Sequence, residues 1–180
     1  DVAPPPRHAR SGAVDDLRAW FEHGTAALER MLARKRPLTV GVFAGSDPDE
    51  INEIADESGV DLIQLSGGEP WEFCLLANRQ AIKSVAIGPE DGVGEALARI
   101  QAGSALAVLL DRAEAGAHGG TGKAFDWGVA AAVAATMPVW LAGGLDPENV
   151  AAAVARVRPW CVDVSSGVET DGMKDAAKIR

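Results

Sequence analysis

The sequence has few cysteines, fewer basic than acidic residues and no long hydrophobic run, and each shortage excludes a class of protein. Two cysteines without metal-site spacing are too few for a disulfide framework. We therefore expect a reducing compartment, the cytoplasm. Seventeen Lys and Arg residues against 26 Asp and Glu residues give a net charge of −9, which argues against nucleic acid or an anionic membrane surface as a partner. No apolar run reaches the roughly 18 residues that a transmembrane helix needs.

The chain begins with a polar, Pro-rich stretch rather than with Met. Residues 1–12 lack the hydrophobic region of a signal peptide, and we expect them to form a loop or loose arm. The missing initiator Met leads us to expect a piece of a longer chain. With 47% hydrophobic and 24% charged residues overall, the composition is typical of a globular domain, which we assign to residues 13–180.

Six short apolar runs, the strand candidates, alternate with segments of helical periodicity. The strand candidates are residues 38–43, 60–65, 81–87, 105–110, 138–142 and 161–164. The helix candidates are residues 13–34, 47–59, 70–78, 93–102, 126–136, 146–157 and 174–180. Gly24 is expected to divide the first helix into two. Strands that are apolar on both faces and separated by helices form parallel sheets, so the pattern predicts an α/β fold.

Polar and Gly-rich signals follow the carboxyl end of nearly every strand candidate. A parallel (β/α)₈ TIM barrel builds its site there, whereas a doubly wound sheet would concentrate such signals at one switch point. The pattern therefore favours the barrel, with about six of its eight βα units in this chain. We expect the other two strands to precede residue 1, so that the helix at 13–34 follows the second strand of the barrel.

Two loops on consecutive strand ends have the composition of phosphate-binding loops. Glycines at the end of a strand let the backbone approach an anion closely, and small hydroxyl residues offer donors. Each loop alone is equally consistent with an ordinary turn, but the pair predicts a phosphate site. The residues proposed to bind phosphate are Gly143, Gly144, Ser165, Ser166 and Gly167.

Asp111 ends the fourth strand candidate, where a carboxylate would point into the mouth of the barrel. Partial burial would raise its pKa and suit it to general acid catalysis. The alternative is a structural carboxylate that caps a nearby loop. Asp163 is expected to have a structural role in the polar core. Cys74 in a helix and Cys161 at the entrance of a strand are not placed to act as nucleophile or base.

Three long segments, in the right order, resemble the signature segments of phosphoribosylanthranilate isomerases. They are Gly119-Gly-Thr-Gly-Lys-Ala-Phe-Asp-Trp127, Leu141-Ala-Gly-Gly-Leu-Asp-Pro-Glu-Asn-Val150 and Val162-Asp-Val-Ser-Ser-Gly-Val-Glu-Thr170. Shorter likenesses occur at residues 40–43 and 61–67, and the resemblance covers about residues 37–180. The ending at 171–175 is similar to the fungal branch, in which the isomerase is often the C-terminal part of a multifunctional tryptophan biosynthesis protein.

The resemblance implies an Amadori rearrangement of a small phosphosugar, N-(5-phosphoribosyl)anthranilate, to 1-(2-carboxyphenylamino)-1-deoxyribulose 5-phosphate. A general acid protonates the furanose oxygen, the ring opens to a Schiff base, and a general base removes the C2′ proton. Asp111 matches the family's general acid, and the five loop residues named above match its phosphate-binding residues. The resemblance implies no metal and no organic cofactor, and it allows further tryptophan-pathway domains fused upstream.

The sequence departs from the family pattern at three places. The family's general base is a Cys in a Lys-Ile-Cys-Gly-like motif, which does not occur here because the chain starts downstream of it. Ser66 stands where the family usually has His. The basic segment that holds the anthranilate carboxylate has only Arg7 and Arg10 as loose candidates. We therefore expect the 180 residues alone to be inactive or nearly so.

Two alternatives stay open. One is a non-catalytic barrel that binds a sugar phosphate without a general base. The other is a different sugar-phosphate barrel enzyme, such as an epimerase or a thiamine-phosphate synthase. An epimerase would need metal-binding His and Asp residues on several strand ends, and the sequence has no such set.

Overall fold

The computed structural model describes residues 14–112 and 127–180. The expected arm at 1–12 and the Gly-rich segment at 119–126 lie outside these ranges. The strands of the main sheet are β1 (Val40–Phe43), β2 (Leu62–Leu65), β3 (Gln80–Ile87), β4 (Ala107–Arg112), β5 (Trp140–Leu141) and β6 (Cys161–Val162). All six strands expected from the sequence are therefore present within the described residues.

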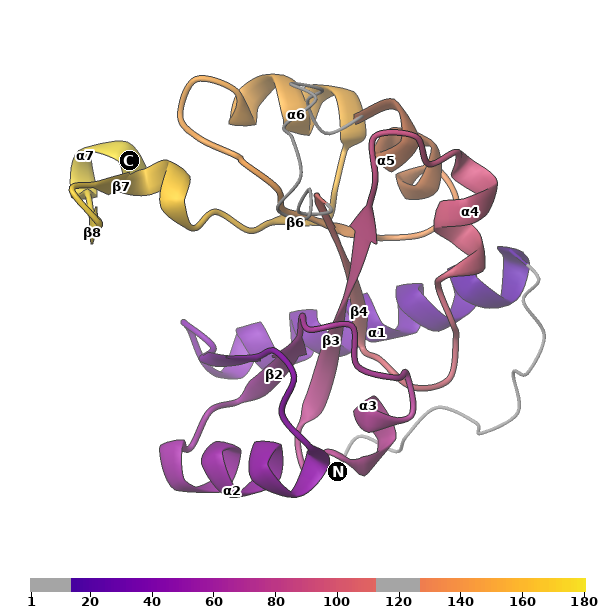
Figure 1. The fold of residues 1–180 in the computed structure, drawn as a ribbon, viewed down its shortest axis with the longest axis vertical. Coiled ribbons are helices and arrows are strands. Elements are labelled where there is room, and N and C mark those ends of the chain that lie inside the picture. The colour runs from indigo at the N-terminus through magenta and orange to yellow at the C-terminus, as the bar shows by residue number, and fades with distance from the viewer. Residues whose placement is uncertain (1–13, 113–126) are drawn as a thin grey trace.

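The six strands pair in parallel and in strict chain order, from β1 to β6 (Figure 1). A doubly wound sheet would reverse its strand order at a switch point, so this topology confirms the barrel type of fold. The carboxyl ends of all six strands consequently meet at one edge of the curled sheet.

The helices are shorter than the periodic segments that predict them. They are α1 (Val14–Arg34), α2 (Pro48–Ser58), α3 (Phe73–Leu76), α4 (Val93–Ala98), α5 (Trp127–Ala134), α6 (Val150–Val157) and α7 (Ala176–Ile179). Between β6 and α7 the chain forms the short 3₁₀ helix η1 (Ser166–Val168) and an antiparallel hairpin of β7 (Glu169–Thr170) and β8 (Met173–Lys174). The hairpin was not expected, because two-residue strands carry too little periodicity to be recognised.

Helix α2 shows how local chemistry sets the ends of these elements. The carboxylate of Asp47 accepts hydrogen bonds from the backbone N–H groups of Asp49 and Glu50, and Pro48 occupies the first turn. At the other end Gly59 adopts a left-handed conformation with φ 66°. The predicted N-cap and terminating glycine are both confirmed.

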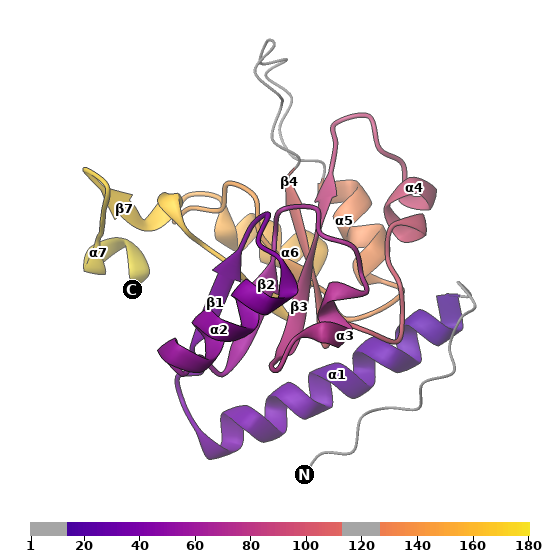
Figure 2. The same cartoon turned by 60° about the horizontal axis from the view of Figure 1, so that its bottom comes forward.

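Helix α1 is a single helix, and the expectation that Gly24 divides it is wrong. A methyl group at Gly24 would overlap the backbone carbonyl oxygen of Leu106, so the glycine serves close packing rather than a break. Nearby, the indole N–H of Trp20 donates to the carbonyl of Ala105 at 2.7 Å. Helix α1 thus crosses the amino-terminal ends of the strands, opposite the edge where a barrel builds its site (Figure 2).

The strands are buried on both faces of the sheet, and β4 shows which side chains face the helices and which face inward. Val108 and Leu110 belong to the large cluster that includes side chains of α4, α5 and α6. Ala107 and Leu109 belong to a second cluster on the inner, concave face of the sheet. Because side chains alternate along a strand, Asp111 continues the inner-facing row at the carboxyl end of β4.

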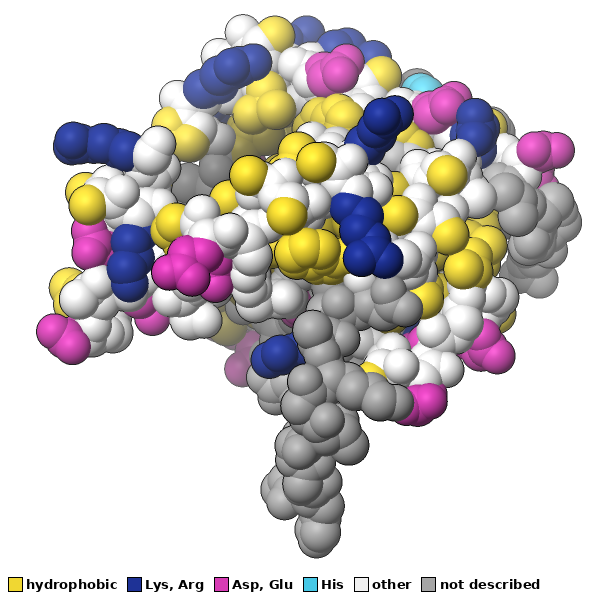
Figure 3. All heavy atoms as spheres, turned by 90° about the horizontal axis from the view of Figure 1, so that it is seen from above, with side chains coloured by type: hydrophobic (Ala, Val, Ile, Leu, Met, Phe, Trp, Pro, Cys, Tyr) yellow, Lys and Arg dark blue, Asp and Glu magenta, His cyan; other side chains and the backbone are white. Residues whose placement is uncertain are grey.

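Charged and hydrophobic side chains are mixed on the face of the molecule that carries α5 and α6 (Figure 3). Over α5 and α6, Lys and Arg side chains are dispersed among hydrophobic ones rather than gathered into a basic stripe (Figure 3). None of the helices in the described ranges is long and apolar enough to cross a membrane. On the edge strand β1, Val42 is 63% exposed, which makes this edge a candidate for unwanted strand pairing.

Candidate active site

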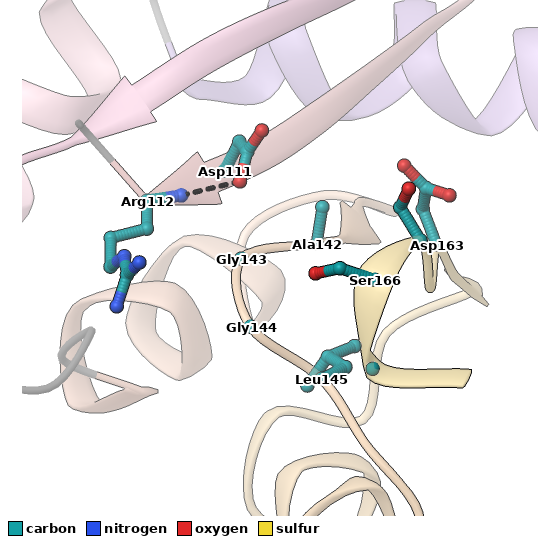
Figure 4. Close-up of a pocket in the computed structure, with 10 residues that line it drawn as sticks. Asp111, Arg112, Ala142, Gly143, Gly144, Leu145, Asp163 and Ser166 are labelled. Carbon is teal, nitrogen blue, oxygen red and sulfur yellow. Dashed lines mark hydrogen bonds between the residues drawn. The ribbon is translucent and has the colours of Figure 1, made fainter. Parts of the chain in front are cut away.

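A pocket of about 250 Å³ opens at the carboxyl ends of β4, β5 and β6. The six residues that the sequence predicts for the site all line this pocket, and the other four lining residues lie at the ends of the same three strands or in the loops that follow them. The lining consists of Asp111, Arg112, Ala142, Gly143, Gly144, Leu145, Asp163, Ser165, Ser166 and Gly167. The structure therefore brings together residues that are more than fifty positions apart in the sequence (Figure 4).

The first loop, after β5, depends on two glycines with left-handed backbones. Gly143 has φ 91° and Gly144 has φ 76°, a region that side-chain-bearing residues rarely adopt. Gly143 also lies close to β4, since a Cβ there would be 2.8 Å from the backbone nitrogen of Arg112. The amide of Asn149 braces the loop by donating to the carbonyl of Gly144 at 2.9 Å. Both glycines line the pocket, so the backbone of this turn forms part of its wall.

The second loop, after β6, is packed directly against the first. A methyl group at Gly167 would overlap the carbonyl oxygen of Leu145, so only glycine permits this approach. On its other side the loop is held by Lys174, whose ammonium group donates to the carbonyl of Ser165 at 3.0 Å and to the carboxylate of Glu169 at 2.7 Å. The hydroxyl of Ser166 points into the space between the two loops (Figure 4).

Asp111 lies across the pocket from the second loop (Figure 4). One of its carboxylate oxygens accepts a hydrogen bond from the backbone N–H of Arg112 at 2.7 Å. The same oxygen would be 3.2 Å from a Cβ at Gly143, so the small residue leaves room for the carboxylate. The predicted position of Asp111 at the mouth of the fold is thus found, while its role in catalysis stays a prediction.

Asp163 is a pocket residue that the sequence did not single out for the site. It was expected to have a structural role, which stays a prediction, and it lies half-buried in the pocket wall. Burial raises the pKa of its carboxyl group above the usual value, while Lys174 acts in the opposite direction. Its position two residues before Ser165 was a usable signal, because residues two apart at a strand end share a face.

The two cysteines lie away from the pocket lining. Cys74 is buried in α3, and this burial raises the pKa of its thiol to about 11. Cys161 begins β6, two residues before Asp163 of the pocket wall, and burial followed by the nearby charge of Asp163 raises the pKa of its thiol as well. A thiol with a raised pKa is a poor base or nucleophile at neutral pH. Within the described ranges, no group of three or more His, Cys, Asp and Glu residues is arranged to hold a metal ion.

Comparisons with known proteins agree with this geometry. The family model of N-(5′-phosphoribosyl)anthranilate isomerase matches residues 7–180. The chain belongs to this family. An N-(5′-phosphoribosyl)anthranilate isomerase of Desulforudis audaxviator is 44% identical over 154 residues, which are 84% of this chain and 74% of that protein. A multifunctional tryptophan biosynthesis protein of Phycomyces blakesleeanus is 39% identical over 176 residues, 89% of this chain but 23% of that protein.

Solved structures of the family share the fold. The phosphoribosylanthranilate isomerase of Thermotoga maritima has a TM-score of 0.66 and 35% identity, covering 86% of this chain and 76% of that one. A second isomerase structure, in complex with reduced 1-(o-carboxyphenylamino)-1-deoxyribulose 5-phosphate, has a TM-score of 0.62 and 30% identity, covering 86% and 75%. The isomerase family, the link to tryptophan biosynthesis and the barrel fold, all expected from the sequence, are confirmed.

Proposed function

We propose that the pocket binds the phosphate group of N-(5-phosphoribosyl)anthranilate and that Asp111 is the general acid of its Amadori rearrangement. One observation carries the proposal: the two loops interlock, through Gly167 and Leu145, around a single cavity that has Asp111 on its wall. Backbone N–H groups and the hydroxyls of Ser165 and Ser166 are suitable donors for a phosphate in a protein of net negative charge.

The chemistry requires one acid and one base. Asp111, in its protonated form, donates its proton to the furanose ring oxygen, and the C1′–O bond breaks to give an open-chain Schiff base. A base then removes the proton from C2′, and the resulting enolamine tautomerises to the ketose. No oxidant is needed, because the product is an isomer of the substrate: the proton that Asp111 gives to the ring oxygen is matched by the proton that the base takes from C2′, and the tautomerisation moves one proton from the C2′ hydroxyl to C1′. We propose Asp111 for the first step and assign neither Cys74 nor Cys161 to the second.

The positions of the cysteines favour one alternative, a barrel that binds the sugar phosphate without turning it over. The family's base is expected to be a Cys, but both cysteines of this chain lie outside the pocket lining, and both have raised pKa values. In that case phosphate affinity is retained and the rearrangement does not occur.

Two measurements on the 180-residue chain separate these functions. One is calorimetric titration with inorganic phosphate, and the other is conversion of N-(5-phosphoribosyl)anthranilate followed by chromatography. Binding with turnover supports the isomerase, and binding without turnover supports the non-catalytic barrel. Absence of both would contradict the phosphate site itself.

Two further proposals concern fusion to other tryptophan-pathway domains and the location of the protein in the cell. Likeness to the multifunctional protein of Phycomyces blakesleeanus supports a fungal-type fusion, whereas likeness to bacterial proteins named only as the isomerase supports a separate enzyme. The mass of the native protein on an immunoblot decides between them. Membership in a biosynthetic family supports the cytoplasm, and cell fractionation tests that location.

A further inference from the structure

A buried ion pair lies outside the pocket, and the proposed chemistry does not use it. The ammonium group of Lys83 is 3.3 Å from a carboxylate oxygen of Glu69, and the two side chains are only 4% and 3% exposed. Charges are costly to bury unless they are paired and hydrogen-bonded. The hydrogen bonds that satisfy this pair therefore indicate what it does in the fold.

The carboxylate of Glu69 joins the turns that follow two neighbouring strands. It accepts the backbone N–H of Gly45, after β1, at 2.9 Å and the backbone N–H of Gly67, after β2, at 3.0 Å. Lys83 adds a hydrogen bond to the carbonyl of Leu65, the last residue of β2, at 3.4 Å. Burial opposes ionisation of Glu69, but the Gly45 amide and Lys83 outweigh it and lower the pKa.

The two turns are also in steric contact. A Cβ at Gly67 would be 2.8 Å from the backbone carbonyl carbon of Ala44. A glycine and a shared carboxylate therefore join the two turns, and separating them would break hydrogen bonds to a buried charge. Such bonds are among the stronger polar contacts in proteins.

The ion pair lies on the helix-facing side of the sheet rather than on its inner face. Lys83 faces Leu65 in the strand register and shares its helix-facing side with Ala81, which packs near α2 and α3. On the opposite, inner face, the amide of Gln64 donates to the hydroxyl of Ser66 at 3.0 Å. The ion pair therefore holds the turn that carries Ser66 from the helix-facing side of the sheet. This turn and the pocket both lie at the carboxyl ends of the strands, but the turn follows β2, whereas the pocket is built from β4 to β6.

We propose that Glu69 and Lys83 are positioning residues that lock the turns after β1 and β2 into one rim, and that this rim orients the part of the substrate remote from the phosphate. The role of the rim in orienting the substrate rests on the proposed function, whereas the locking of the two turns does not. The phosphate pocket, built from β4 to β6, does not depend on the ion pair.

The test replaces the pair by the double substitution Glu69→Met and Lys83→Met. Exchanging a buried ion pair for apolar residues of similar volume preserves folding in other proteins, so the variant loses the acceptor for both turns without leaving a lone buried charge. Thermal unfolding checks that it is folded. The single variant Glu69→Asp, which keeps the charge on a shorter side chain, is compared for partial rescue.

Three readouts follow. Amide hydrogen exchange at Gly45 and Gly67 accelerates by at least about tenfold in the double variant, as expected for lost hydrogen bonds to a charge. The affinity for reduced 1-(o-carboxyphenylamino)-1-deoxyribulose 5-phosphate falls by about tenfold or more. The affinity for inorganic phosphate stays within about twofold of wild type, as does exchange in β4 to β6.

Unchanged exchange at the two glycines overturns the locking role, whatever the ligands do. An equal loss of affinity for both ligands overturns the positioning role and indicates general destabilisation. If the wild-type chain binds neither ligand, the proposed function fails, while the exchange measurement still decides whether the pair locks the turns.

Discussion

Gly167 lies so close to the carbonyl oxygen of Leu145 that no larger residue fits between the two loops. The loops after β5 and β6 are therefore one structural unit, in which a shift of either loop changes the shape of the other. This contact, rather than the composition of each loop, makes a single anion site physically reasonable, because donors from both loops then converge on one cavity.

The substitution Gly167→Ala should separate the loops and weaken phosphate binding by at least about tenfold, since donors placed for one anion lose their common centre. Calorimetric titration with inorganic phosphate measures the effect. The matched control is Gly94→Ala, because a Cβ at Gly94 in α4 meets no atom within 4 Å. The control should bind phosphate as wild type does and gain up to about 1 kcal/mol of stability from helix propensity. Equal phosphate affinity in both variants would contradict the shared site.

Replacing Asp111 by Asn should slow the rearrangement by about 10²- to 10⁴-fold, the usual contribution of a general acid. The phosphate affinity should not fall, because the substitution removes a negative charge from the pocket. Rates are measured with enzyme in excess over N-(5-phosphoribosyl)anthranilate, so that slow turnover is still visible. Asp49→Asn, on the exposed surface of α2, is the charge-matched control. Where wild-type turnover is measurable, a rate for the Asp111 variant equal to that of the control would remove Asp111 from the mechanism.

The cysteines should be unreactive in the folded protein. The thiol of Cys74 has a pKa of about 11 because it is buried, so little thiolate exists at pH 8, and the side chain belongs to a buried cluster with Ile51 and Ala55 of α2. We expect alkylation by iodoacetamide to be at least about tenfold slower than in urea. Mass spectrometry of timed samples reports both sites. Rapid labelling of Cys74 in the native protein would show that the site opens or that the thiol is activated.

Stability at low pH should depend on Asp61, which joins the end of α1 to the segment before β1. Its carboxylate accepts from Lys35 at 2.8 Å and from the backbone N–H of Thr39 at 2.7 Å. These bonds lower the pKa to about 2 from 3.8. Because the folded-state pKa is the lower one, the stabilisation is present above about pH 4 and is lost as the pH falls towards 2.

The variant Asp61→Asn should therefore show a weaker loss of stability between about pH 4 and pH 2 than wild type. Urea unfolding at a series of pH values, followed by circular dichroism, gives the slopes. Asp49→Asn again serves as control. Identical slopes for wild type and the Asp61 variant would mean that the interaction with Lys35 and Thr39 does not distinguish the folded from the unfolded state.

Much of the fold follows from local patterns. Alternation of β-branched runs with helical periodicity predicts all six strands of the main sheet. The caps Asp47 and Gly59 set the ends of α2 through bonds to residues two to four positions away. Such signals lie within one element and its flanks, so they can be read without knowing what the element packs against. The motifs at 141–150 and 162–170 predicted the pocket lining for the same reason.

By itself, the sequence determined the α/β repeat and six residues of the pocket, because these depend on spacing along the chain, and its resemblance to the family's signature segments indicated the isomerase family. Only the tertiary structure decided that α1 stays whole at Gly24, that Asp163 lies in the pocket wall, and that Glu69 and Lys83 form a buried pair. Each of these outcomes depends on a contact between segments far apart in the chain. The free energy of such a contact comes from burial and close approach, which no local pattern of residues encodes.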